Sequence, residues 1–245
     1  MRSRIDRPIV LLHGCGGSFS ATFAATGWLD AIAAAGRRAV GLHLPGHGAI
    51  PSPHEPAHYS DLAGLVARDL PPVSFDAVGF SLGAKILLEL ALRPPARVAR
   101  LVLGGVGDNV FAPETIAESV ARALECGPSA ETPPAVLAFL RTWEPDQNDA
   151  LAVAAVLRRP PNPSFTPERI EQIAQPMFIV NGADDPVATL GDRLVSSLRN
   201  VSYAELPGVD HFGLPAQPAF IRRALDFLAS ASGQDATTRQ KERAT

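Results

Sequence analysis

Continuous apolar runs recur along this chain, and most are followed by a glycine-rich loop and then by a helical pattern. A run without polar alternation is typical of a strand that is buried on both faces of a parallel sheet. Strands that alternate with helices predict an α/β fold, here with a mostly parallel sheet of about six or seven strands flanked by helices. Six strands are predicted at residues 8–12, 37–44, 75–78, 98–103, 175–181 and 201–206.

Apolar residues at helical spacing predict helices at 24–35, 59–70, 84–90 and 218–231, and Ser60 is placed to cap the second of these. In parallel sheets, ligands bind beyond the carboxyl ends of the strands. Residues with useful chemistry follow the predicted strands at these ends: His13, Ser81, Asp184, Asp185 and His211. We therefore expect the functional site at the carboxyl edge of the sheet.

One region breaks the alternation of strands and helices. Between residues 108 and 174, helical patterns at 114–124, 134–143 and 149–157 stand among many prolines, without a convincing strand. A helical insertion that covers the carboxyl edge of the sheet as a cap or lid accounts for this most simply; ordinary crossover helices are the alternative. We expect a core of residues 1–107 and 175–232, a helical cap of residues 108–174, and a disordered polar tail at 233–245.

Composition and charge exclude several classes of function. Hydrophobic residues make up 46% of the chain, enough for a packed core, and the net charge of −3 with scattered Lys and Arg excludes the basic face of a nucleic-acid-binding protein. Cys15 and Cys126 form neither a disulfide framework nor a metal-binding spacing. No apolar stretch is long enough to span a bilayer. We expect a cytoplasmic protein without cofactor, metal, membrane or nucleic-acid partner; the oligomeric state stays open.

The most informative motif is Gly79-Phe80-Ser81-Leu82-Gly83, which stands between a predicted strand and a predicted helix. In that context a G-x-S-x-G motif places its serine on a sharp turn with the hydroxyl exposed above the sheet. The small residues on either side let strand and helix approach each other without a Cβ clash. The backbone N–H of Leu82 faces the same space. Ser81 is therefore a candidate nucleophile; a glycine-rich turn capped by a serine is the alternative.

A serine nucleophile needs a base, and the base needs an acid that orients it. The chain has candidates for these roles at strand ends, in the order Ser, Asp, His. Together with the G-x-S-x-G motif, whose sharp turn is called the nucleophile elbow, this order resembles the α/β-hydrolase superfamily. The resemblance extends from residue 8 to about 231 and is carried by four motifs, at residues 12–18, 44–48, 79–83 and 181–187.

The resemblance implies a role for each candidate. Ser81 looks like the nucleophile and His211 like the general base. Asp185 best matches the acid that orients this base and completes the catalytic triad. Its neighbour Asp184 is the second choice, and Asp108 occupies the place where some relatives carry the acid.

The resemblance also implies an oxyanion hole made of two backbone N–H groups. One belongs to Leu82, after the nucleophile, and the other to Cys15, in the loop after the first strand. His13 and His47 look structural rather than catalytic. We expect a substrate pocket between sheet and cap, lined by Phe80, Val110, Phe111, Leu140 and Trp143.

The leading functional hypothesis is a serine hydrolase of the carboxylesterase type, which cleaves a small, apolar ester through an acyl-enzyme on Ser81. The same catalytic residues could also cleave thioesters, lactones or carbon–carbon bonds. Two alternatives remain open. The same fold serves ligand-binding proteins with little or no turnover, and an exposed cap could also serve as the surface of an interaction module.

Three features depart from the family's pattern. Many relatives begin with two further strands, for which residues 1–7 are too few. Relatives often carry Asp where this chain has His43. Lys85 is unusual in a helix at the middle of the sheet and could pair with Glu89 one turn later.

Overall fold

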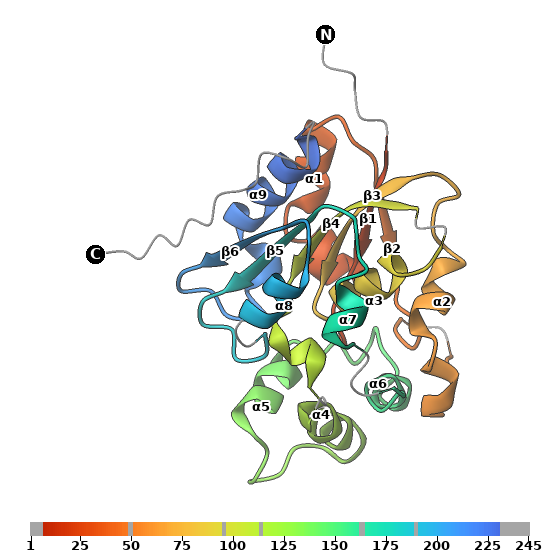
Figure 1. Cartoon of the computed structure of the whole chain (residues 1–245). Helices are drawn as coiled ribbons and strands as arrows, with labels where there is room; N and C mark the ends of the chain where they lie inside the picture. Colours follow the sequence, from red (N-terminus) through yellow and green to blue (C-terminus); the bar gives the residue numbers. More distant parts are fainter. Residues whose placement is uncertain are drawn as a thin grey trace.

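Six parallel strands form a single sheet in the part of the chain described by the computed structural model, which covers residues 7–48, 51–94, 97–112, 115–161, 165–188 and 191–230 (Figure 1). Their order across the sheet is β2-β1-β3-β4-β5-β6, and every neighbouring pair is parallel. The predicted α/β fold is thereby confirmed. The strands are β1 (Ile9–Leu12), β2 (Ala39–Leu42), β3 (Phe75–Phe80), β4 (Val98–Gly104), β5 (Met177–Gly182) and β6 (Val201–Leu206).

Helices cover both faces of the sheet because successive strand residues point to opposite faces. In β1, Ile9 and Leu11 join an apolar cluster with α1 (Trp28–Ala34) and α9 (Pro218–Ala229). Val10 and Leu12 join a second cluster on the other face, with α2 (Leu62–Ala67), α3 (Leu82–Ala91) and α8 (Asp192–Ser197). The continuous apolar runs of the sequence therefore reflect burial on both faces.

The strand order reverses between β1 and β3, since the chain proceeds from β1 to β2 in one direction and from β3 to β6 in the other. Such a switch point separates the loops that leave the two strands and is where ligands bind in open α/β sheets. Leu12, the last residue of β1, pairs with Gly79 of β3. The loop after β1 consequently lies beside Ser81, which directly follows β3.

Between β4 and β5, residues 108–174 form a helical segment that contains no strand among its described residues. Figure 1 shows α4, α5 and α6 gathered beyond the carboxyl ends of the strands. Arg158 holds α4 and α6 together through ion pairs with Glu118 and Glu125. The elements are η3 (Asp108–Phe111), α4 (Thr115–Cys126), α5 (Pro134–Arg141), α6 (Ala150–Leu157) and α7 (Pro167–Ile170).

Several local predictions need correction. Asp61, rather than Ser60, caps α2, because its carboxylate accepts a hydrogen bond from the N–H of Gly64. The helix predicted at 24–35 begins only at Trp28, as α1, because Gly27 before it has a φ of +90°. A short helical turn, η1 (Ser20–Ala24), precedes it. The sequence pattern missed α8, which has only six residues. Two further short turns are η2 (Pro56–Tyr59) and η4 (Leu214–Ala216).

The predicted tail at 233–245 lies outside the described residues. Among those that are described, no helix combines the length and apolar character needed to cross a membrane.

Candidate active site

Ser81 lies on a sharp turn between β3 and α3. Its backbone has φ +52° and ψ −112°, and of the described residues it is the one other than glycine with a positive φ. A conformation of this kind costs on the order of 1–3 kcal/mol. Backbone hydrogen bonds hold it, from Ser81 N to Gly104 O at 2.8 Å and from Lys85 N to Ser81 O at 3.1 Å. The turn places the serine at the carboxyl edge of the sheet.

The two glycines of the motif are required by close backbone approach. A Cβ on Gly79 would lie 2.7 Å from the carbonyl of Gly83. A Cβ on Gly83 would lie 2.2 Å from the carbonyl oxygen of Leu12 in β1. Both distances are far below van der Waals contact, so no other residue fits without displacing β1 or α3. The two glycines thus let the start of α3 pack closely against both β3 and β1.

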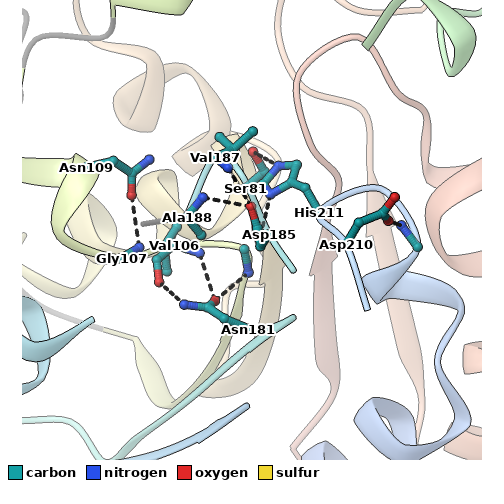
Figure 2. Close-up of polar contacts among 12 residues, drawn as sticks. Ser81, Val106, Gly107, Asn109, Asn181, Asp185, Val187, Ala188, Asp210 and His211 are labelled. Atoms are coloured by element: carbon teal, nitrogen blue, oxygen red, sulfur yellow. Dashed lines mark hydrogen bonds and ion pairs between the residues drawn. The ribbon is translucent and has the colours of Figure 1, made fainter. Parts of the chain in front are cut away.

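His211, 3% exposed, links Ser81 to Asp185 (Figure 2). Its Nε2 lies 3.1 Å from the Ser81 Oγ, and its Nδ1 lies 2.7 Å from Oδ2 of Asp185. The other carboxylate oxygen accepts hydrogen bonds from the N–H groups of Val187 and Ala188. Burial acts to raise the pKa of Asp185, but the hydrogen bond and charge of His211 and the two backbone donors outweigh it and lower that pKa.

The other acidic candidates point elsewhere. Asp184 is exposed beside Asp185. Asp108 accepts hydrogen bonds from two N–H groups at the start of α8, including that of Leu194 at 2.8 Å. Asp210 precedes His211 in the chain but accepts a hydrogen bond from its own turn, facing away from the histidine (Figure 2). The structure therefore brings Asp185, and none of these three, against His211.

A cavity of about 560 Å³ opens at this edge of the sheet, between the strands and the helical segment. Ser81 and His211 line it, together with Leu82 after the elbow and Gly14 and Cys15 after β1. Residues of α4 and α5 line its opposite side, and most of the lining is apolar. Among the described residues, no group of three His, Cys, Asp or Glu side chains is arranged to hold a metal ion.

His13 and His47 organise the loop after β1 by accepting backbone hydrogen bonds. Nε2 of His13 accepts from Leu44 N at 3.1 Å, and Nε2 of His47 accepts from Gly16 N at 2.9 Å. Their Nδ1 atoms lie 2.8 Å from Gly14 O and 3.2 Å from Pro45 O. Burial lowers the pKa of His13 to about 3 and that of His47 to about 4, so both rings are neutral and donate from Nδ1.

The lining of the cavity differs from the predicted pocket. Phe80 lines it as expected, and its ring packs 4.9 Å from that of His211, centroid to centroid. The other four predicted residues do not line it, and their side chains pack in or against apolar clusters: Val110, Phe111, Leu140 and Trp143. Charged residues that were not predicted line the cavity instead: Lys85, Glu144 and Arg159.

Two buried asparagines near the site were missed as well. Asn181, at 1% exposed, bonds through its side-chain amide to both the N–H and the carbonyl of Val106 and so joins the ends of β4 and β5 (Figure 2). Asn148, at 7% exposed, lies just before α6 and bonds to the loop after β1. Asn181 stands at the end of an apolar run and within the motif at 181–187, but the sequence gave it no role of its own; Asn148 gave no signal.

Comparisons with known proteins bear on the fold and the family of this chain. The family model described as "Alpha/beta hydrolase family" matches residues 9–224. A pimeloyl-[acyl-carrier protein] methyl ester esterase of Aromatoleum aromaticum is 41% identical over 104 residues, which are 41% of this chain but only 38% of that protein. Among solved structures, an enol-lactonase from Burkholderia xenovorans superimposes with a TM-score of 0.71 at 22% identity, covering 94% of each chain. An esterase from a Rhodococcus species superimposes with a TM-score of 0.67 at 20% identity, covering 94% of this chain and 93% of that one.

Proposed function

The chain belongs to the alpha/beta hydrolase family, and from this we propose that it is a serine hydrolase that cleaves a small carboxylic ester through an acyl-enzyme on Ser81. The observation that carries the proposal is the position of His211, within hydrogen-bond reach of both Ser81 and Asp185. This is the arrangement that turns a weakly nucleophilic hydroxyl into an effective one.

In the proposed reaction, His211 removes the Ser81 proton as Oγ attacks the carbonyl carbon of the ester. Asp185 holds the Nδ1–H of the imidazole and stabilises the imidazolium that forms. The tetrahedral intermediate collapses to the acyl-enzyme, and His211 gives its proton to the departing alcohol. Water then attacks the acyl-enzyme while His211 takes one of its protons. His211 returns that proton to Ser81 Oγ as the bond between Oγ and the acyl carbon breaks, and the carboxylic acid is released.

The N–H groups of Cys15 and Leu82 are the proposed donors to the oxyanion of the tetrahedral intermediate. Both residues line the cavity beside Ser81. A cavity of about 560 Å³ with a mostly apolar lining suits an apolar acyl or alcohol group of modest size. In this proposal the helical segment of residues 108–174 acts as the cap that excludes water from the site. The esterase and lactonase relatives support this class of substrate.

The proposal is tested by labelling with a fluorophosphonate and by hydrolysis of p-nitrophenyl acetate. Wild-type protein should be labelled once, at Ser81, and should release p-nitrophenol with an initial burst. Ser81→Ala should lose both properties. Ser196→Ala, which alters an exposed serine of α8, is the control and should keep both. A folded wild-type protein that is neither labelled nor active would instead indicate a ligand-binding protein without turnover.

A further inference from the structure

The side chain of Asn148 connects the helical segment to two loops of the core. Its Nδ2 donates to Gly16 O at 3.2 Å and to Glu144 O at 3.3 Å, and its Oδ1 accepts from Gly48 N at 3.1 Å. These three bonds use both donors and the acceptor of the amide. Gly16 and Gly48 are 132 and 100 residues away in the chain. The bonds therefore join segments that no local structure would bring together.

The hydrogen bond to Gly16 is linked to the N–H of Cys15 through one further hydrogen bond. Gly16 O and the N–H of Gly17 belong to one planar peptide group, and that N–H donates to Gly14 O at 3.3 Å. Gly14 O and the N–H of Cys15 belong to another planar group, the peptide that joins these two residues. The orientation of the Cys15 N–H therefore depends on a chain of two rigid peptide groups, and Asn148 holds its far end.

Histidines hold the same loop from the core side. His47 accepts from Gly16 N, and His13 donates to Gly14 O. The rings of Phe139 and Trp143, also in the helical segment, lie close to Gly16 but offer it no polar group. The side chain of Asn148 adds a hydrogen bond from the helical segment to a loop that the core holds at two other points. Neither histidine bonds to Gly16 O, so the carbonyl that Asn148 holds depends on the helical segment.

We infer that Asn148 is a positioning residue, which makes the orientation of the proposed oxyanion donor Cys15 N–H depend on the docked position of the helical segment. The inference rests on the proposed function, because it assigns a catalytic consequence to the loop after β1. It predicts that loss of the bond to Gly16 weakens stabilisation of the transition state while leaving substrate binding in the cavity nearly unchanged.

The test compares Asn148→Asp with Asp149→Ala. The first variant is nearly isosteric and keeps an acceptor for Gly48 N, but it turns a carboxylate oxygen toward Gly16 O. The second removes the N-cap of α6 and the hydrogen bond with His54 but has no contact with Gly16, so it controls for general loosening of the helical segment. Asn148→Ala removes the amide without adding charge. It replaces Asn148→Asp in the comparison if that variant does not fold.

Two readouts separate positioning from stability. With p-nitrophenyl esters, N148D should lower kcat about 10- to 100-fold, below the full effect of deleting an oxyanion donor, with KM within about 2-fold. The affinity for phenylboronic acid, which forms a tetrahedral adduct on serine, should fall by the same factor as kcat/KM. D149A should change each value by less than about 3-fold, although it costs stability of about 1 kcal/mol.

Equal losses in N148D and D149A, or an unchanged kcat in N148D or N148A, would overturn the inference while leaving the serine hydrolase standing. Wild-type protein that neither hydrolyses the esters nor binds the boronate would overturn the proposed function, and the inference with it.

Discussion

Acid should unfold this protein through His13 and His47 well before its carboxylates are protonated. Both histidines are buried and neutral, and each accepts a backbone N–H at Nε2, which a protonated ring cannot do. Their folded pKa values, about 3 and about 4, lie below the unfolded value of 6.5. The unfolded state therefore binds more protons, and stability is present above pH 6.5 and lost as the pH falls toward 4.

The size of the effect follows from the linkage relation. Between pH 7 and 5.5 each histidine lowers the free energy of unfolding by about 1.3 kcal/mol, and the pair by about 2.5 kcal/mol. That is a large part of the roughly 5–15 kcal/mol available to a domain. The pKa of Asp185 is lowered by folding, so the stability that it contributes is lost only at more acidic pH, below the ordinary pKa of 3.8 for an aspartate. The positive charge of Arg159 lowers the pKa of His47 further.

The assay is urea unfolding followed by circular dichroism at pH 7.0, 6.0 and 5.5. His47→Gln keeps an acceptor for Gly16 N and a donor for Pro45 O but cannot titrate, so it should lose about half of the dependence on pH whatever its stability at pH 7. His58→Gln alters an exposed histidine and should keep the full dependence. Wild-type stability that is constant from pH 7 to 5.5, or an unchanged slope in H47Q, would refute the reasoning.

Other substitutions test the remaining parts of the structure. Asp185→Asn should lower kcat by about 10⁴-fold, since it disturbs the tautomer of the base, while Asp184→Asn should leave kcat within about 2-fold; the reverse result would assign the acid to Asp184. Asp76→Asn should cost about 3–5 kcal/mol in urea unfolding, because it removes the charge that pairs the buried guanidinium of Arg37 at 2.7 Å. Gly83→Ala should yield little folded protein on size-exclusion chromatography, because its Cβ would meet a backbone carbonyl of β1.

The fold and the triad geometry could be anticipated because their signals are local. Each strand is a short apolar run, and each reactive residue follows one of them, so parallel topology alone brings Ser81, Asp185 and His211 to one edge. The choice between Asp185 and Asp184 illustrates the limit of this reasoning. Adjacent residues in a turn face different directions, and only the fold shows that one of them meets the histidine.

Asn148 and the cavity lining could not be anticipated, because they depend on how the helical segment docks. Helices α4 and α5 are amphipathic, so their large apolar side chains were the natural candidates for a pocket wall. In the structure, Leu140 and Trp143 instead pack against a cluster formed within the segment. Other members of the same cluster, such as Val120 and Phe139, line the cavity, together with the charged Glu144 and Arg159. Which apolar residues of an amphipathic helix reach a pocket depends on how that helix docks, and its sequence pattern does not show this.

The core and the helical segment contribute different parts of the proposed active site. The core holds Ser81, His211 and Asp185 through contacts in which the helical segment takes no part. The oxyanion loop differs, because Asn148 of the helical segment bonds to it directly. A displacement of the helical segment would therefore leave the hydrogen bond between Ser81 and His211 in place, while the N–H of Cys15, a proposed oxyanion donor, would be held less firmly. On this reasoning, substitutions in the helical segment alter kcat through Asn148 and substrate preference through the cavity lining, and the two effects are separable by residue.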